Sequence, residues 1–147
     1  MATRELTTEG ITTATKQRAF DRVAVALRKQ GRPAYKQRSQ KCLYEDADGA
    51  RCALGHLLTA KEIGILRRGK RLDATINELS TRLVQGVVNR HKVDEQFLSA
   101  LQSTHDKPAL EYMNGTDPKQ WLRLWKAQMR VVAQMHGLKT TKLGKAA

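Results

Sequence analysis

The sequence is short of acidic residues, aromatic residues, cysteine and long apolar runs. It has two cysteines, which cannot form a disulfide framework, and both thiols are expected to stay reduced. No apolar run approaches the roughly 18 residues of a membrane span. The first twenty residues lack the apolar stretch of a signal peptide. These absences favour a protein that remains in the cytoplasm where it is made.

The remaining composition is that of a globular domain. Hydrophobic residues make up 40% of the 147 residues and charged residues 28%. A chain of this length most often forms one domain. It can bury about 68–70% of its unfolded surface, so it needs neither metal nor disulfide to fold. No cofactor is predicted.

The charge balance is the strongest signal in the composition. Lysine and arginine number 27 against 14 aspartates and glutamates, which gives a formal charge of +13 and a pI near 10.2. This excess repels itself in a compact state unless a polyanion offsets it. DNA or RNA is the first candidate partner, an acidic protein surface the second, and an anionic membrane a weaker third.

The residue pattern predicts a mainly α (α+β) fold, a compact domain of about four to six helices with one β-hairpin after the first helix. Phe20, Val23, Ala24 and Leu27 form one apolar stripe of a helix over 13–30, which Gly31 ends. A hairpin is expected at about 41–52, because the residues at 46–49 favour a turn. A short helix over 53–58 and a short helical piece over 59–72, which ends at the basic residues 67–71, follow.

Capping signals predict the later helices. Thr75 and Glu78 form a capping-box pattern that opens a helix to about residue 90, and Asp94 caps another helix that Pro108 ends. The clearest helix covers 118–136, from the N-cap Asp117 to Gly137. The single domain is therefore expected over 13–137, between a flexible N-terminus (1–12) and a basic flexible tail (138–147).

Basic residues gather on the outer faces of predicted helices. At 100° per residue, the four basic residues of the last helix share an arc of about 60°. Rows of one charge sign lack the stabilising pairs that oppositely charged residues form at i, i+4. Their presence therefore favours a polyanion-binding role over a merely solvated face. In order of preference, the candidate binding residues are Lys119, Arg123, Lys126 and Arg130, then Arg67, Arg68, Lys70 and Arg71, then Arg18, Arg22 and Lys29.

The segment CLYEDADGARCALGH, residues 42–56, raises the alternative of a zinc site or a cysteine enzyme. Four zinc ligands could come from Cys42, Cys52, His56 and His105, but the spacing is not that of a standard zinc knuckle. Cys52 beside Arg51 could be a nucleophile, but Asp106 is expected to point away from His105, because neighbours on a helix face different directions. A metal-dependent phosphohydrolase is a further possibility, with His91, His105, Asp106 and Asp117 as its residues. For neither enzyme does the spacing of the residues match a known catalytic motif. We therefore predict no catalytic residue and read the segment as a structural hairpin with packed thiols.

The order of the segments also resembles a family. The segments FDRVAVALRKQGRPA, KCLYEDADGARCALGHLL, LSALQSTHD and the tryptophan helix ending QMHGL resemble small accessory proteins, functionally unassigned, of tailed bacteriophages and prophages. The resemblance covers roughly residues 18 to 138. Its sharpest part is Cys-x-Tyr…Gly-x-x-Cys-Ala-x-Gly, here Cys42, Tyr44, Gly49, Cys52, Ala53 and Gly55. The resemblance implies a viral protein that acts in the cytoplasm of an infected bacterium.

Together these features predict a non-catalytic phage protein that binds nucleic acid through basic helix faces. One alternative is an inhibitor or modulator that docks on an acidic surface of the host transcription, replication or defence machinery. A small zinc- or cysteine-dependent enzyme is the second alternative.

Overall fold

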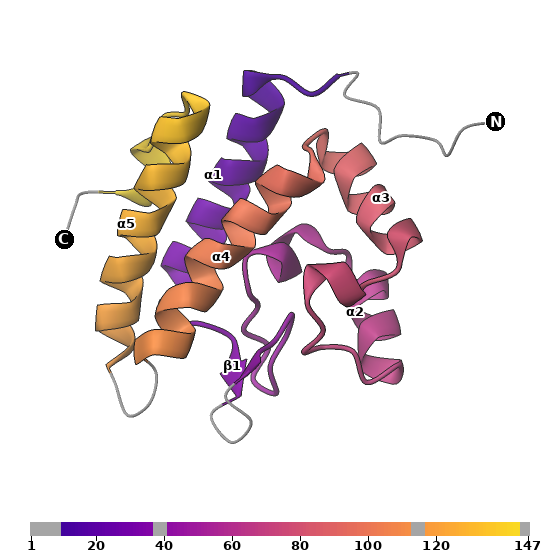
Figure 1. Ribbon diagram of the computed structural model, residues 1–147. Coiled ribbons are helices and arrows are strands. Elements are labelled where there is room, and N and C mark those ends of the chain that lie inside the picture. Colours follow the sequence, from indigo (N-terminus) through magenta and orange to yellow (C-terminus); the bar gives the residue numbers. More distant parts are fainter. Residues whose placement is uncertain (1–9, 37–40, 113–116, 145–147) are drawn as a thin grey trace.

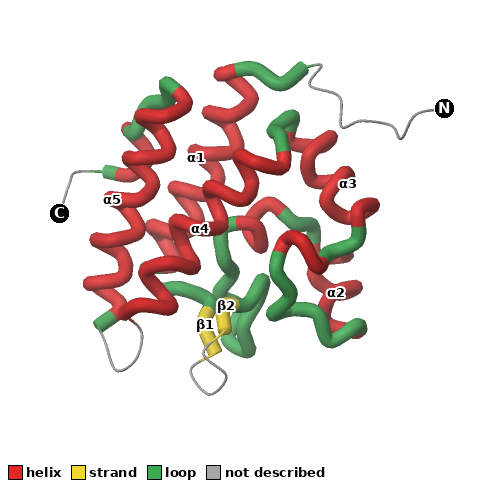
Figure 2. The backbone as a smooth tube through the Cα atoms, viewed as in Figure 1, coloured by secondary structure: helices red, strands yellow, loops and turns green. Residues whose placement is uncertain are grey.

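A computed structural model describes residues 10–36, 41–112 and 117–144. Over these ranges the chain forms five α-helices, three short 3-10 helices and a two-stranded antiparallel sheet (Figures 1 and 2). The elements are α1 (Thr13–Gln30), β1 (Tyr35–Lys36), β2 (Lys41–Cys42), η1 (Leu54–Leu57), α2 (Ala60–Arg68), η2 (Ile76–Glu78), α3 (Thr81–His91), α4 (Glu95–Tyr112), α5 (Pro118–His136) and η3 (Thr141–Leu143). The predicted mainly α fold with a hairpin after the first helix is confirmed.

Three long helices form the body of the molecule. α4 packs along α5, and α1 contacts both of them from behind in the view of Figure 1. α2 and α3 lie on the far side of α4 from α5, and the sheet lies at the lower end. None of the described helices combines the length and the apolar character needed to cross a bilayer.

The core joins these helices through large apolar side chains. Trp121 and Trp125 of α5 are fully buried and stack on each other with ring centroids 5.7 Å apart. Phe20 and Leu27 of α1 are fully buried in the same cluster. Burying each such side chain contributes about 1.5–3 kcal/mol, so packing rather than helix propensity holds α1 and α5 in place.

The predicted ends of α1 and α5 are confirmed. Thr12 and Thr15 form a reciprocal capping box before α1, and Gly31 ends it with φ at +73°. In α5, the Asp117 side chain accepts from the backbone N–H of Lys119, Pro118 is the first helical residue, and Gly137 ends the helix with φ at +67°. Glycine suits both C-termini because it has no Cβ that disfavours positive φ.

The hairpin pairs other residues than those predicted. β1 and β2 pair Tyr35 with Cys42, whereas the expected hairpin over 41–52 is reduced to one bridge between Glu45 and Arg51. Asp46 closes the turn at 46–49 itself, because its Oδ1 accepts from the N–H groups of residues 48 and 50. These side-chain hydrogen bonds, with the backbone bonds from Asp46 to Ala50 and from Gly49 to Asp46, hold the turn in place of the longer ladder that the turn residues suggested.

The helix expected from the Thr75–Glu78 capping box is divided. The box forms, but it opens one 3-10 turn, and Leu79 then returns to extended backbone. α3 begins only at Thr81, where the Ser80 side chain accepts from the N–H of Leu83. Ser80 is therefore a second N-cap, which interrupts the predicted continuous helix.

The prediction that Pro108 ends its helix is wrong. Asp94 caps α4 as expected, since its Oδ1 accepts from the N–H of Phe97, but the helix continues through Pro108 to Tyr112. Proline inside a helix removes one hydrogen bond and crowds the preceding turn, which costs about 3 kcal/mol. Ala109 is fully buried where α4 packs against α5, and this packing offsets the local cost.

The prediction of a flexible tail is wrong for residues 138–144. Leu143 of η3 is fully buried against α1, and Leu138 is buried as well. The Gln17 side chain accepts from the N–H of Lys139 at 2.8 Å and donates to its carbonyl at 3.0 Å. Of the two predicted flexible ends, residues 1–9 and 145–147 lie outside the described residues.

Candidate nucleic-acid interface

Lys119, Arg123, Lys126 and Arg130 form the α5 basic row. The buried face of α5, which carries Trp121 and Trp125, orients this row toward the surface. Lys119 and Arg123 are exposed, while Lys126 and Arg130 are half-buried. Neighbouring elements therefore cover part of the C-terminal half of the row. No described carboxylate lies within 4.0 Å of any of these four side chains.

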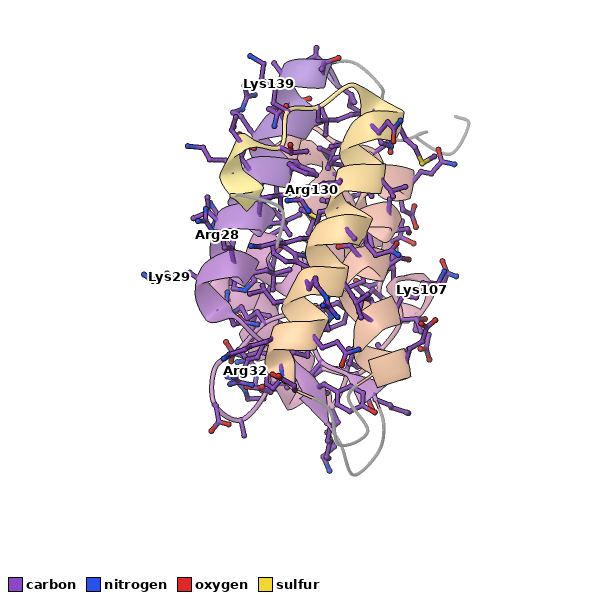
Figure 3. All side chains as sticks on the ribbon, turned by 90° about the vertical axis from the view of Figure 1, so that its left-hand side faces the viewer. Arg28, Lys29, Arg32, Lys107, Arg130 and Lys139 are labelled. Carbon is purple, nitrogen blue, oxygen red and sulfur yellow. The ribbon has the colours of Figure 1, made fainter. Side chains whose placement is uncertain are left out.

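The C-terminal segment joins α5 to the surface of α1. The Arg28 guanidinium donates to the carbonyl of Lys142 at 3.5 Å, and a Cβ at position 144 would meet that guanidinium at 2.7 Å. Glycine at 144, with φ at +77°, therefore permits this close approach. Figure 3 shows Arg28, Lys29, Arg130 and Lys139 on the side of the molecule formed by α1, α5 and this segment.

Arg18, Arg22 and Lys29 form the α1 basic row, and all three are exposed. Arg18 and Arg22 line a groove of about 630 Å³ together with Arg90 and Lys92 at the end of α3. Arg22 donates to the carbonyl of His56 at 3.1 Å, a contact that orients the guanidinium and leaves its charge unneutralised.

We group the cations of α1, α5 and the C-terminal segment under one name, the basic face. Its members are Lys16, Arg18, Arg22, Arg28, Lys29, Lys119, Arg123, Lys126, Arg130, Lys139 and Lys142. The helices and the segment that carry them contain one acidic residue, Asp21. Within the described ranges, no member of the basic face forms an ion pair. Figure 3 places Lys29 and Arg130, one member of each of two predicted groups, on the same side of the molecule, while Arg18 and Arg22 line the groove toward α3.

The third predicted group, Arg67, Arg68, Lys70 and Arg71, lies elsewhere. It spans the C-terminal end of α2, on the opposite side of the molecule from α5 (Figure 1). Arg67 forms an ion pair with Glu45. Arg67 and Lys70 line a pocket that also contains four carboxylates, those of Glu45, Asp46, Asp48 and Asp73. This region has mixed charge, which is unfavourable for a polyanion.

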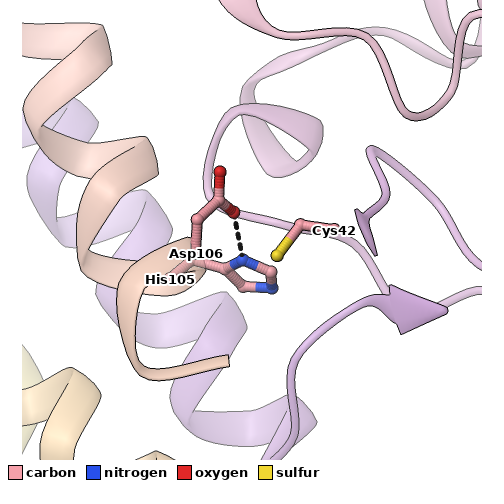
Figure 4. Close-up of side chains that lie close together, drawn as sticks. All are labelled: Cys42, His105 and Asp106. Atoms are coloured by element: carbon pink, nitrogen blue, oxygen red, sulfur yellow. Dashed lines mark hydrogen bonds and ion pairs between the residues drawn. The ribbon is translucent and has the colours of Figure 1, made fainter. Parts of the chain in front are cut away.

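The cysteines and histidines do not assemble as the zinc alternative required. Cys42, His105 and Asp106 lie together, with ligand atoms within 4.8 Å of one another (Figure 4). Cys52 is buried apart from this group and accepts from the N–H of Gly55 through its sulfur. The His56 ring contacts the Gln30 side chain at 2.9 Å.

The hydrogen bonds of His105 favour a structural role for this cluster. The fully buried ring accepts from the N–H of Ala34 through Nε2 at 3.0 Å, so Nδ1 carries the proton that is donated to Asp106 Oδ1 at 2.7 Å. The expectation that Asp106 points away from His105 was therefore wrong. Both ring nitrogens are engaged, and a metal ion would have to displace one of these bonds.

The cysteine thiols are also poor nucleophiles. Burial raises the pKa of Cys42 far above its usual range, and the neighbouring Asp106 charge raises it further. Burial likewise raises the pKa of Cys52 to about 12. A nucleophilic or metal-binding cysteine needs its thiolate, which these surroundings disfavour. The thiols are packed as the sequence predicted, but the contact to Asp106 was not foreseen.

No family model, curated protein or solved structure matches the chain.

Proposed function

We propose that the protein is a non-catalytic accessory protein of a tailed bacteriophage and binds nucleic acid through the basic face. It acts in the cytoplasm of the infected host. The phage origin is supported by the resemblance of the segment from Cys42 to Gly55. The choice of partner is supported by the position and the pairing of the charges.

One observation carries the proposal. The six ion pairs among the described residues that do not involve histidine all lie between Arg32 and Arg90, while the eleven cations of the basic face have none. A row of like charges weakens a helix by a few tenths of a kcal/mol per pair. A polyanionic partner offsets this repulsion, and the phosphate backbone is the commonest one.

The binding is expected to be independent of base sequence. Both tryptophans are buried in the core, and aromatic residues are 5% of the chain, so few rings are left to stack on bases. Lysine and arginine contacts to phosphate then dominate. With about five such contacts, log K falls with log salt at a slope of about −4 to −5.

The test measures the anisotropy of a fluorescent random-sequence duplex at about 50 mM and about 200 mM salt. The variant Lys126→Gln/Arg130→Gln removes two charges from the basic face. Its matched control, Arg68→Gln/Arg71→Gln, removes two exposed charges from the mixed region. Each lost phosphate contact is worth nearly tenfold at about 0.1 M salt, so the first variant should bind on the order of 50-fold more weakly.

The control variant should stay within about threefold of wild type, since it changes net charge alone. Equal weakening of both variants would show that net charge, and not the basic face, attracts the duplex. Failure of the wild-type protein to bind duplex, or binding that ignores salt, would overturn the proposal.

A further inference from the structure

α5 carries a second apolar row in addition to its core face. Leu124, Ala127, Val131 and Met135, which we call the α5 ridge, are spaced by three, four and four residues. Met135 is 76% exposed and Val131 is 51% exposed. Ala127 is exposed as well, and Leu124 is half-buried. Trp121, Trp125 and Met129 fill the core from a neighbouring face of the helix, centred about 120° from the ridge, so the exposed ridge side chains are not part of the core.

The ridge is continuous and bordered by cations. At 100° per residue its four side chains share an arc of about 80°, and Ala127 lies about 40° from Arg123 of the α5 basic row. Arg130 lies along the same border. On the other side, Figure 3 shows Lys107 of α4 beyond α5 and away from α1. Single exposed apolar residues are ordinary, but a row at helical spacing is the pattern of a helix that docks a partner.

We infer that the α5 ridge is a docking surface for an acidic amphipathic helix of another protein. Charge complementarity selects this occupant, because a helix with an apolar stripe and flanking carboxylates would meet the ridge and the bordering cations together. A second copy of this chain would place the same cations against each other. Nucleic acid would satisfy the cations and leave the aliphatic side chains in water.

This inference goes beyond nucleic-acid binding and does not depend on it. The ridge side chains are separate from the cations of the basic face, and a variant can remove one without the other. Removing two exposed apolar side chains should leave the fold intact, which far-ultraviolet circular dichroism checks. The two proposals can therefore fail independently.

The probe is a synthetic, fluorescently labelled helical peptide of about 18 residues, with leucine at positions i, i+3, i+4 and i+7 and glutamate at most others. Its control is a scrambled peptide of the same composition. The protein is the full chain, as wild type, as Val131→Ser/Met135→Ser, and as the matched control Val25→Ser/Ile65→Ser, which removes two other exposed apolar residues.

The patterned peptide should bind wild type and the matched control alike. The ridge variant should bind it at least about tenfold more weakly, because two apolar contacts are lost. The scrambled peptide should bind wild type about tenfold more weakly than the patterned one. Duplex affinity should be the same in the ridge variant and wild type.

Three outcomes would overturn the inference. Equal binding of both peptides, or of both variants, would show that charge alone attracts the peptide. Ridge-dependent dimers in sedimentation would assign the ridge to a second copy. Ridge-dependent binding to phosphatidylglycerol vesicles in preference to the peptide would assign it to a bilayer.

Discussion

Two regions of the molecule differ in whether their charged side chains form ion pairs. Residues 41–78 carry acids and bases in near balance, and Glu45 alone forms ion pairs with both Arg51 and Arg67. The basic face carries eleven cations, none of which pairs with a carboxylate of the described ranges. The charges are thus divided between a part that pairs its own acids and bases and a part whose cations pair with no carboxylate of the described ranges.

The difference follows from what holds each region together. Residues 41–78 contain long irregular stretches, which depend on polar side chains such as Asp46 and Glu45 to satisfy the backbone and to join neighbouring loops. α1 and α5 satisfy their own backbones and are fixed by buried side chains and caps. Their outer faces are therefore unconstrained by folding and can be specialised for binding.

The largest expected effect concerns Leu143, the buried side chain that holds the C-terminal segment against α1. Leu143→Ala should lower the free energy of unfolding by about 3 kcal/mol, because the side chain is fully buried between η3 and α1. Urea denaturation followed by tryptophan fluorescence measures it. The control Leu110→Ala removes a side chain that is 50% exposed and should change stability by less than about 1 kcal/mol. Similar values for both would show that the C-terminal segment does not pack on α1 in solution.

The next effect tests whether α1 and α5 act as one surface. Arg18→Gln/Lys29→Gln should weaken duplex binding on the order of 50-fold at about 0.1 M salt and reduce the salt slope by about 1.8, as expected for two lost phosphate contacts. Combined with Lys126→Gln/Arg130→Gln, the losses should multiply. An unchanged salt slope in the α1 variant would confine nucleic acid to α5 and divide the basic face in two.

The long helices could be predicted from sequence because their signals are local. Gly31, Asp117 and Gly137 mark ends that depend on a few neighbouring residues, and these ends match the structure. Pro108 does not end α4 as predicted, because the packing of α4 on α5 outweighs the free energy that proline costs inside a helix. Leu143 was missed because no periodic pattern marks it, and its burial depends on α1, more than a hundred residues earlier in the chain.

The candidate site was predictable as a list of cations and not as a surface. The sequence shows that Arg130 and Lys29 lie on the outer faces of helices, but only the packed structure shows that the C-terminal segment connects those faces. Arg67 carries the same charge, yet its pairing with Glu45 depends on a contact between α2 and the loop after β2. Sequence spacing cannot indicate such nonlocal neutralisation.

A smaller effect concerns pH where the basic face meets the loops. Burial, together with the nearby positive charges of Arg51 and Arg22, lowers the pKa of His56 from 6.5 to about 4. Above pH 6.5 the ring is neutral in both states and contributes nothing. As the pH falls from 6.5 toward 4, the unfolded chain gains a proton that the folded chain does not, so stability decreases.

By pH 5 this loss should reach about 1.5 kcal/mol, after allowance for the partial solvent exposure of the ring. Denaturation at pH 7.5 and at pH 5 should therefore show a smaller loss in His56→Gln than in wild type. Burial also lowers the pKa of His91, so part of the loss should persist. An identical pH dependence in both proteins would show that His56 is accessible to protons in the folded state.

The smallest effect differs in sign between the basic face and the ion pair that Glu62 of residues 41–78 forms with Arg90, and it is the sharpest test of the comparison. Lys126→Gln/Arg130→Gln should raise the free energy of unfolding by about 0.5 kcal/mol at low ionic strength, because it relieves repulsion along the α5 basic row. Arg90→Gln should lower it by about 1 kcal/mol, because Arg90 bonds Glu62 at 2.7 Å and the Leu57 carbonyl at 3.0 Å. Added salt should reduce the first difference by screening. Destabilisation of the α5 variant would mean that the row supports the fold, and its lack of ion pairs would then no longer indicate an external partner.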